Sequence, residues 1–202
     1  SESLAVSVTA VDDPPMANPD TYFVRAGGSL SVSDASGNAT GTTADNGLLL
    51  NDVDPDTPGL SVVSVTAPAN ASFFNVNSSG TFIYRHDGST TLSDSFTYRA
   101  SDGNSTSDPA TVTINVNHPP VAAAITALSV SEFAMDGATV GSVSATDLNP
   151  SDVLTWEITA GNSAGVFEID SATGLITVPD TSLLDFETTP SYDLTVTITD
   201  DA

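Results

Sequence analysis

The residues of this chain whose type and number could support chemistry are those with short acidic side chains. Of the 26 acidic residues among 202, five are glutamates and the rest are aspartates. Aspartates set in loops with Asn, Gly, Ser and Thr suit a hard cation such as calcium, which takes six to eight oxygen ligands at about 2.3–2.6 Å. Aspartate is also a common turn residue, so a turn explains any single one more simply. We therefore expect chemistry only where several acids come together.

The overall charge restricts the partners. The formal net charge is −23, because only three arginines (Arg25, Arg85 and Arg99) and no lysine oppose the acids. Nucleic acid and anionic membranes both need a positive surface, so neither is expected as a partner, whereas cations are. The absence of cysteine excludes a disulfide framework and thiolate metal chemistry. Because no apolar run approaches the ~20 residues of a membrane span and no signal peptide is visible, we expect export and anchoring sequences to lie elsewhere.

Catalytic motifs are missing from the sequence. His86 and His118 are too few and too far apart to argue for zinc binding or general-base catalysis. The sequence contains no nucleophile elbow, zinc-protease motif or glycine-rich phosphate loop. The pair Asp12–Asp13 could be the acid pair of a glycosidase, but its position in a linker favours calcium. We predict that the protein is not an enzyme.

Trp156 leaves one alternative function open. An exposed tryptophan can stack on a sugar ring, as in a calcium-dependent polysaccharide-binding module. However, Leu154, Trp156 and Ile158 share one face of an expected strand, which favours a tryptophan in the hydrophobic core.

The elements that must position the acids are β-strands. Apolar residues alternate in short segments at intervals of roughly 8–12 residues, which is typical of a sandwich or barrel, and no stretch keeps a helical period over three turns. The alternating sets are Leu4-Val6-Val8, Leu60-Val62-Val65, Phe82-Tyr84, Phe96-Tyr98, Val112-Ile114-Val116, Leu154-Trp156-Ile158, Leu175-Ile176-Val178 and Leu194-Val196-Ile198. The expected fold class is all-β.

Two proline pairs, Pro14–Pro15 and Pro119–Pro120, divide the chain. Each follows a valine-rich strand and precedes a new one, and because proline fixes φ and restricts its predecessor, both pairs indicate stiff linkers. We expect residues 1–13 to be the final strand and linker of a preceding domain, residues 14–117 to form one domain, and residues 118–202 to form a second.

The two expected domains have similar sequence plans. The segment from Gly47 to Asp54 aligns with that from Gly141 to Asn149, and FNVNSSGTFI (74–83) aligns with FEIDSATGLI (167–176). Asp94 aligns approximately with Asp185, and Ser101-Asp102 aligns with Thr199-Asp200. Such repetition is typical of arrays of tandem domains.

Residues 130–202 resemble a cadherin repeat. The resemblance rests on VSEFAMDGATVGSVSATDLNPSDVLTWEI, GNSAGVFEIDSATGLITV and LLDFETTPSYDLTVTITD, and it covers almost the whole second domain. The first domain resembles the cadherin-like or immunoglobulin-like tandem repeats of giant bacterial surface adhesins through ANPDTYFV, GLLLNDVDPD, GTFIY and DSFTYRASDG. The resemblance implies two tandem Greek-key β-sandwiches, the second having strands A to F, and calcium bound between successive repeats.

The resemblance also implies three groups of calcium ligands, each at one end of a domain. They are Glu132, Asp185 and Glu187 at the C-terminal end of the second domain; Asp147, Asn149 and Asp200 at its N-terminal end; and Asp52, Asp54 and Asp102 at the N-terminal end of the first domain. Two domain ends and a linker together can supply the six to eight oxygens that calcium needs, which no single loop does.

The two kinds of joint between domains should differ. Where a second domain meets the next first domain, the linker acids Asp12 and Asp13 add to the ligands. At the internal joint the strand A glutamate position is Ala26, and the linker is Asn117-His118, which leaves Asp94, Asp147, Asn149 and Asp200. Fewer carboxylates should bind calcium less tightly, so we expect a calcium-rich, stiff joint to alternate with a calcium-poor, more mobile one.

Joined head to tail, the two ends of the chain form a β-hairpin pattern. The junction reads LTVTITDDA followed by SESLAVSVTAVDDPP, two alternating strands around an acidic turn. We therefore interpret the chain as one period of an extracellular bacterial surface protein or filament that binds neighbouring copies of itself. A second domain without its last strand could be completed by the segment Ser3–Val11 of a neighbour. Cell-surface glycans or proteins are further possible partners.

Overall fold

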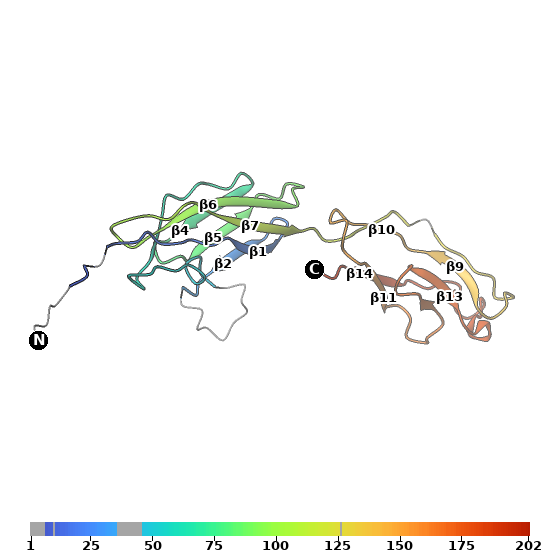
Figure 1. Ribbon diagram of the computed structural model, residues 1–202. Coiled ribbons are helices and arrows are strands. Elements are labelled where there is room, and N and C mark those ends of the chain that lie inside the picture. The colour runs from blue at the N-terminus through green and yellow to red at the C-terminus, as the bar shows by residue number, and fades with distance from the viewer. Residues whose placement is uncertain (1–6, 10, 36–45, 126) are drawn as a thin grey trace, which may run out of the picture. The chain divides into compact units, whose positions relative to one another are not determined.

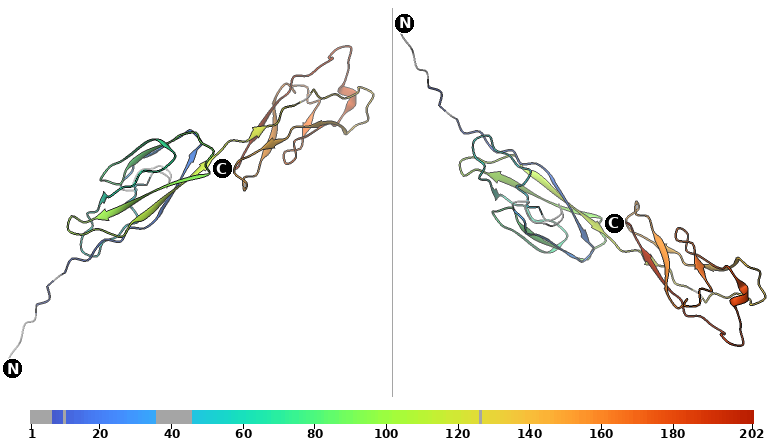
Figure 2. Two further views of the ribbon diagram at one scale, coloured as in Figure 1. Left: turned by 90° about the horizontal axis from the view of Figure 1, so that it is seen from above. Right: turned by 90° about the horizontal axis from the view of Figure 1, so that it is seen from below.

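The chain consists of two compact units, residues 1–117 and residues 118–202. The computed structural model describes residues 7–9, 11–35, 46–125 and 127–202. As expected, the fold is all-β, and the helical element described is one 3₁₀ turn at Thr181–Leu183 (Figure 1). The strands run mainly along the length of each unit (Figure 2).

The described strands of the first unit form two sheets. One has the order β1 (Asp20–Arg25), β7 (Ala110–Asn117), β6 (Ser93–Ser101) and β3 (Ser61–Val63). In it β1 and β7 are parallel, and the other pairs are antiparallel. The second has the order β2 (Ser29–Val32), β5 (Phe82–His86) and β4 (Ala71–Val76). Inward and outward residues alternate along β5 and β7, as the apolar periodicity predicts.

Aromatic side chains join the two sheets of the first unit. The ring of Phe82 on β5 contacts Tyr22 on β1 and Phe96 on β6, with centroids 5.0 and 5.5 Å apart in edge-to-face geometry. All three side chains are buried. Contacts of this kind between the inner faces of two sheets form the core of a β-sandwich.

Two carboxylates lie against this core near one hydroxyl group. The Tyr98 hydroxyl lies 3.0 Å from Oδ2 of Asp52 and 3.3 Å from Oδ2 of Asp20. Burial, and then the charge of Asp52, raise the pKa of Asp20 from 3.8 to about 7. The ionised form of Asp20 therefore costs the first unit stability at neutral pH.

Replacing Asp20 should change how the first unit responds to pH. Because the folded pKa exceeds the unfolded one, the folded state binds more protons between pH 3.8 and about 7, and stability falls as pH rises through that window. We expect Asp20→Asn to stabilise the unit at pH 8 by about 1–2 kcal/mol, a value discounted for partial solvent exposure. The variant should also lose the decrease in stability with rising pH. Thermal unfolding in chelator from pH 4 to 8 measures both. The exposed-site variant Asp108→Asn should keep the wild-type pH dependence; an identical pH dependence in all three proteins would contradict the prediction.

The second unit has shorter strands. β9 (Ala138–Ser142), β13 (Leu175–Val178) and β12 (Glu168–Ile169) form one sheet, in the order β12, β13, β9. β11 (Thr155–Ala160) pairs with β14 (Thr195–Thr199), and β8 (Val121–Ala122) pairs with β10 (Ala145–Thr146). Among its described residues, five form the buried core: Val143, Val166, Phe167, Ile176 and Val178. Many more apolar residues around them, including Trp156, are only partly buried.

The hairpins that the sequence alignment paired occur in both units. Phe74–Ile83 lies in the β4–β5 hairpin, and Phe167–Ile176 lies in the β12–β13 hairpin. Trp156 packs against the second core, as the periodicity predicted. In the N-terminal segment predicted to be a strand, Ser1–Val6 and Ala10 lie outside the described residues, while Val8 is 92% exposed and Val11 76% exposed.

Candidate metal sites

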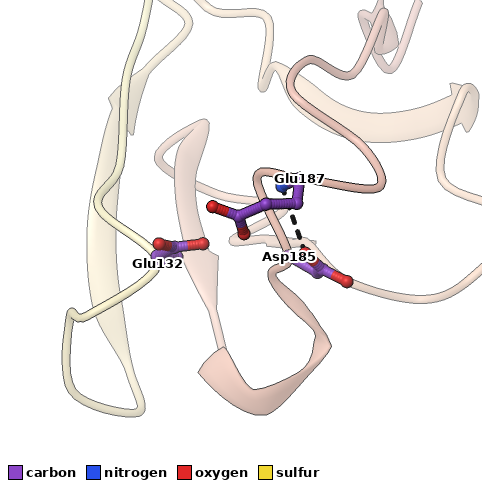
Figure 3. Close-up of side chains that lie close together, drawn as sticks. All are labelled: Glu132, Asp185 and Glu187. Atoms are coloured by element: carbon purple, nitrogen blue, oxygen red, sulfur yellow. Dashed lines mark hydrogen bonds between the residues drawn. The ribbon is translucent and has the colours of Figure 1, made fainter.

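Three carboxylates of the second unit lie close together at the loop that follows the 3₁₀ turn. Glu132, Asp185 and Glu187 place one carboxylate oxygen each within 4.8 Å of the others (Figure 3). The backbone N–H of Phe186 donates to Oε2 of Glu132 at 3.0 Å, which ties the segment before β9 to this loop. The N–H of Glu187 donates to Oδ1 of Asp185 at 3.1 Å, which is the dashed line in Figure 3.

The same unit contains no lysine or arginine that could neutralise this group. Half of the chain's 26 acids lie in residues 118–202, whereas the three arginines all lie in the first unit. A hydrogen bond from the Thr188 hydroxyl lowers the pKa of Asp185, so this carboxylate is ionised at neutral pH. Like charges held this close repel, and a bound cation would relieve the repulsion.

A second acidic cluster consists of Asp147, Asp152 and Asp200. Their carboxylate oxygens also lie within 4.8 Å of one another. Asp147 follows β10 and Asp200 follows β14, so the ends of two strands position them. Asn149 joins this end of the unit to the incoming chain, because its Oδ1 accepts the N–H of His118 at 2.8 Å, while its own N–H donates to Oδ1 of Asp147 at 2.7 Å.

The environment of the second cluster fits a calcium ion. Oδ2 of Asp147 and Oδ2 of Asp152 are buried and accept no hydrogen bond from a protein donor. Desolvation, then the charges of Asp147, Asp201 and Asp200, raise the pKa of Asp152. Buried carboxylate oxygens that face other carboxylates without a donor have the chemistry of a hard-cation site.

The predicted ligands of the first unit partly gather at its N-terminal end. The linker acids contact this end: the Asn104 side chain donates to Oδ1 of Asp12 at 3.2 Å, and the N–H of Asp13 donates to Asp56 at 2.7 Å. Asp102 accepts the N–H groups of Asn104 and Ser105, which lowers its pKa. Oδ1 of Asp54 accepts two backbone N–H groups, and its Oδ2 is buried without a protein donor. Among the described residues, no three acids here come as close together as in the second unit.

Three other predicted ligands make contacts within the first unit. Asp52 is buried and accepts the N–H of Asn18 at 2.7 Å as well as the Tyr98 hydroxyl. Asp94 is also buried and accepts the N–H groups of Ala69 and Asn70 and the hydroxyl of Tyr84. Asn117 is the last residue of β7, and its carbonyl accepts the N–H of Ala26 at 2.8 Å.

Two acids at these domain ends, Asp152 and Asp56, were not among the predicted ligands. Both follow a proline shortly after the aligned motif, in Asp147-Leu-Asn-Pro-Ser-Asp152 and in Asp52-Val-Asp-Pro-Asp56. Both segments share a proline that is followed within two residues by an acid, and this pattern could have identified the two aspartates.

Family comparisons divide the chain at the same place as the structure. Residues 12–118 match the bacterial cadherin-like domain, which covers more than half of the chain, and residues 126–202 match the cadherin domain. The chain belongs to the bacterial cadherin-like family. Both of its units are cadherin-like domains.

Known cadherin relatives match parts of the chain. Mouse protocadherin Fat 4 is 40% identical over 89 residues, and human protocadherin-23 is 39% identical over 88 residues. Each match covers 43% of this chain, and the chain spans only 2% and 3% of the length of these relatives. Among solved structures, mouse cadherin-23 EC22-24 is 21% identical, with a TM-score of 0.45, over 94% of this chain and 61% of that chain.

The described part of the chain has no helix that is long and apolar enough to cross a membrane.

Proposed function

We propose that this cadherin-like chain is a calcium-binding structural and adhesive repeat of a large extracellular bacterial surface protein or filament. The observation that carries the proposal is the pair of three-carboxylate clusters in a unit that contains no lysine or arginine. Such a unit needs an external cation to neutralise its clustered charge. Calcium supplies that charge, and its irregular oxygen coordination suits ligands from separate loops.

Each cluster has its own proposed ligand set. At one end of the second unit the ligands are Glu132, Asp185 and Glu187; at the other they are Asp147, Asp152 and Asp200, with Asn149 beside them. By neutralising the acids, calcium would hold together the loops that carry them, because these loops are otherwise joined by a few hydrogen bonds such as that from Phe186 to Glu132. Rigid domain ends are what a load-bearing filament requires.

Neighbouring copies would complete the exposed site. Glu187 and Asp185 are exposed and Glu132 is half-buried, so this cluster leaves coordination positions open to another molecule. Asp12, Asp13, Asp54 and Asp102 lie at the N-terminal end of the first unit and have carboxylates of the required kind. Head-to-tail contact between copies would bring these two acidic ends to one set of calcium ions.

Counting bound calcium by native mass spectrometry and titration calorimetry tests this function. We expect Asp152→Asn and Glu132→Gln each to remove or weaken at least one ion, with roughly a tenfold or larger loss of affinity at the altered site. Glu157→Gln is the matched control, because it removes one exposed carboxylate of β11 outside both clusters.

The Glu157→Gln control distinguishes the loss of a calcium site from a general effect of net charge. If all three variants weaken calcium binding equally, the loss reflects net charge and the two clusters are not the sites. If wild-type protein binds no calcium at millimolar concentration, the proposed function is wrong.

A further inference from the structure

An exposed patch with apolar and basic side chains lies on the outer face of the β2–β5–β4 sheet in the first unit. Phe73 on β4 is 50% exposed, and Ile83 on β5 is 44% exposed. The register places Arg85 opposite Phe73, and Ile83 lies two residues before Arg85 on the same face of β5. We call these three residues the basic patch. The remaining exposed residues of the three strands are uncharged: Ser29, Ser31, Ser72 and Asn75.

Arg85 has no carboxylate partner in the described part of the chain. Its Nε donates to Oγ of Ser29 at 3.2 Å. Oδ1 of Asp87, the acid nearest to it in sequence, instead lies 3.8 Å from Nε2 of His86 and accepts the N–H of Ser89. Interfaces between proteins are enriched in aromatic residues and arginine and depleted in acids, which is the composition of this patch. We therefore expect its partner to provide a carboxylate and apolar surface.

The equivalent sheet of the second unit has a complementary surface. Glu168 on β12 is exposed and lies opposite Thr177 of β13. Leu175, two residues before Thr177 on the same face of β13, is 37% exposed. Among the described residues, no hydrogen bond or ion pair involves the carboxylate of Glu168. We call Glu168 and Leu175 the acidic patch, and its unit contains no lysine or arginine that could compete for it.

Other strand faces fit this pairing less well. Arg25 is also exposed, but the exposed ring of Phe23 beside it lies opposite a polar residue, Asn115. Glu157 is exposed on β11, but its neighbours on the outer face of β11 and β14 are threonines: Thr155, Thr159 and Thr197. Burial of apolar surface is the main favourable term in association, so the basic patch fits the acidic patch best, because each of the two includes apolar side chains.

We propose that the basic patch of one copy of this chain binds the acidic patch of a second copy, so that two copies lie side by side. Arg85 of one copy pairs with Glu168 of the other. Phe73 and Ile83 cover Leu175, so the ion pair forms beside apolar surface rather than in open solvent.

The contact lies away from the domain ends. Residues 71–86 and 168–178 carry the two patches, and they include neither an end of the chain nor a member of either calcium cluster. One such contact is small, so two free copies should associate weakly. Copies held side by side on a surface would make many of these contacts at once, which raises their combined strength. This inference rests on the adhesive role in the proposed function.

Charge reversal in the full chain tests the pairing. Sedimentation equilibrium in calcium, at up to about 1 mM protein, should show reversible self-association of the wild-type chain. We expect Arg85→Glu and Glu168→Arg each to lower the association constant roughly tenfold or more, because like charges then face each other. The double variant with both changes should recover most of the wild-type association, since it restores an opposite pair and the wild-type net charge.

Two further variants separate the patches from a general effect of charge. Arg25→Glu and Glu157→Arg make the same charge changes on other exposed strand faces, and both should associate like the wild-type chain. Equal weakening by these controls, or a double variant that stays as weak as the single ones, would overturn the proposal. A wild-type chain that is monomeric at about 1 mM would overturn it as well.

Calcium counting on the same variants separates this inference from the proposed function. Neither Arg85 nor Glu168 belongs to a calcium cluster, so native mass spectrometry should find the wild-type number of ions in both variants. If the ion count is kept but the wild-type chain does not self-associate, the calcium function stands and the side-by-side contact is wrong. In that case, loss of alginate binding by Arg85→Glu would identify an acidic polysaccharide as the partner of the basic patch.

Discussion

Removing calcium is expected to lower the melting temperature of the second unit by about 10–20 °C for each site that it empties. Extracellular calcium modules bind with Kd near 10⁻⁴ M, so at about 5 mM calcium one site stabilises the folded state by roughly 2 kcal/mol. In a unit of this size, 1 kcal/mol corresponds to about 4–8 °C. Because the second unit has two clusters, removing calcium should lower its melting temperature more than any other change of solution conditions.

The single tryptophan makes this prediction specific to one unit. Trp156 packs against the second core, so its fluorescence follows the unfolding of the second unit, while calorimetry records both transitions. The melting curve is measured in calcium and again in excess chelator, with magnesium as the control ion. An unchanged fluorescence midpoint would mean that the aspartates serve as turn residues, and the polysaccharide-binding interpretation would then be favoured.

Truncating Phe82 should have the largest mutational effect on stability, at the first unit alone. Phe82 is 1% exposed and packs on Tyr22 and Phe96 from the opposite sheet. Removing a buried phenylalanine ring leaves a cavity and costs about 3–5 kcal/mol, a large part of the stability of a typical domain. Phe82→Ala should therefore lower the midpoint of the first-unit transition in urea, measured by circular dichroism.

Two controls make the Phe82 prediction sharp. Phe23→Ala makes the same truncation on β1 at a side chain that is 68% exposed, and it should cost far less. The Trp156 signal should keep its midpoint in both variants, because the chain divides into two compact units. A shift of the Trp156 transition as large as that of the first unit would show that the two units unfold together.

Sequence periodicity was sufficient to predict a strand where the outward-facing residues of that strand are polar. In β7 every second residue is buried and the residues between are Thr or Asn, so the strand is visible in the sequence. The sequence did not mark β1, β4 and β9 as alternating strands. Phe23 puts a large apolar side chain on the outer face of β1, Phe73 and Phe74 are adjacent in β4, and β9 is built from small residues.

The grouping of acids was only partly predictable. The cadherin resemblance brought Glu132, Asp185 and Glu187 together, although 54 residues separate Glu132 from Glu187, and these three lie together in the structure. It did not indicate Asp152, which reaches Asp147 through a loop closed by the hydrogen bond from its N–H to the carbonyl of Asn149. Loop closure depends on backbone contacts that a residue pattern does not contain.

The sequence by itself therefore determined the all-β class, the acidic character and the motifs that indicate calcium, because alternation and composition are local properties. The tertiary structure decided which acids are available to a cation. Asp52 and Asp54 are two residues apart in one motif, yet Asp52 points to Tyr98 in the core while Asp54 keeps one oxygen without a protein donor. It also showed an apolar groove in the second unit, whose lining includes Leu128, Val130 and Leu194. Both results depend on which segments pack together, and packing is a long-range property of the fold.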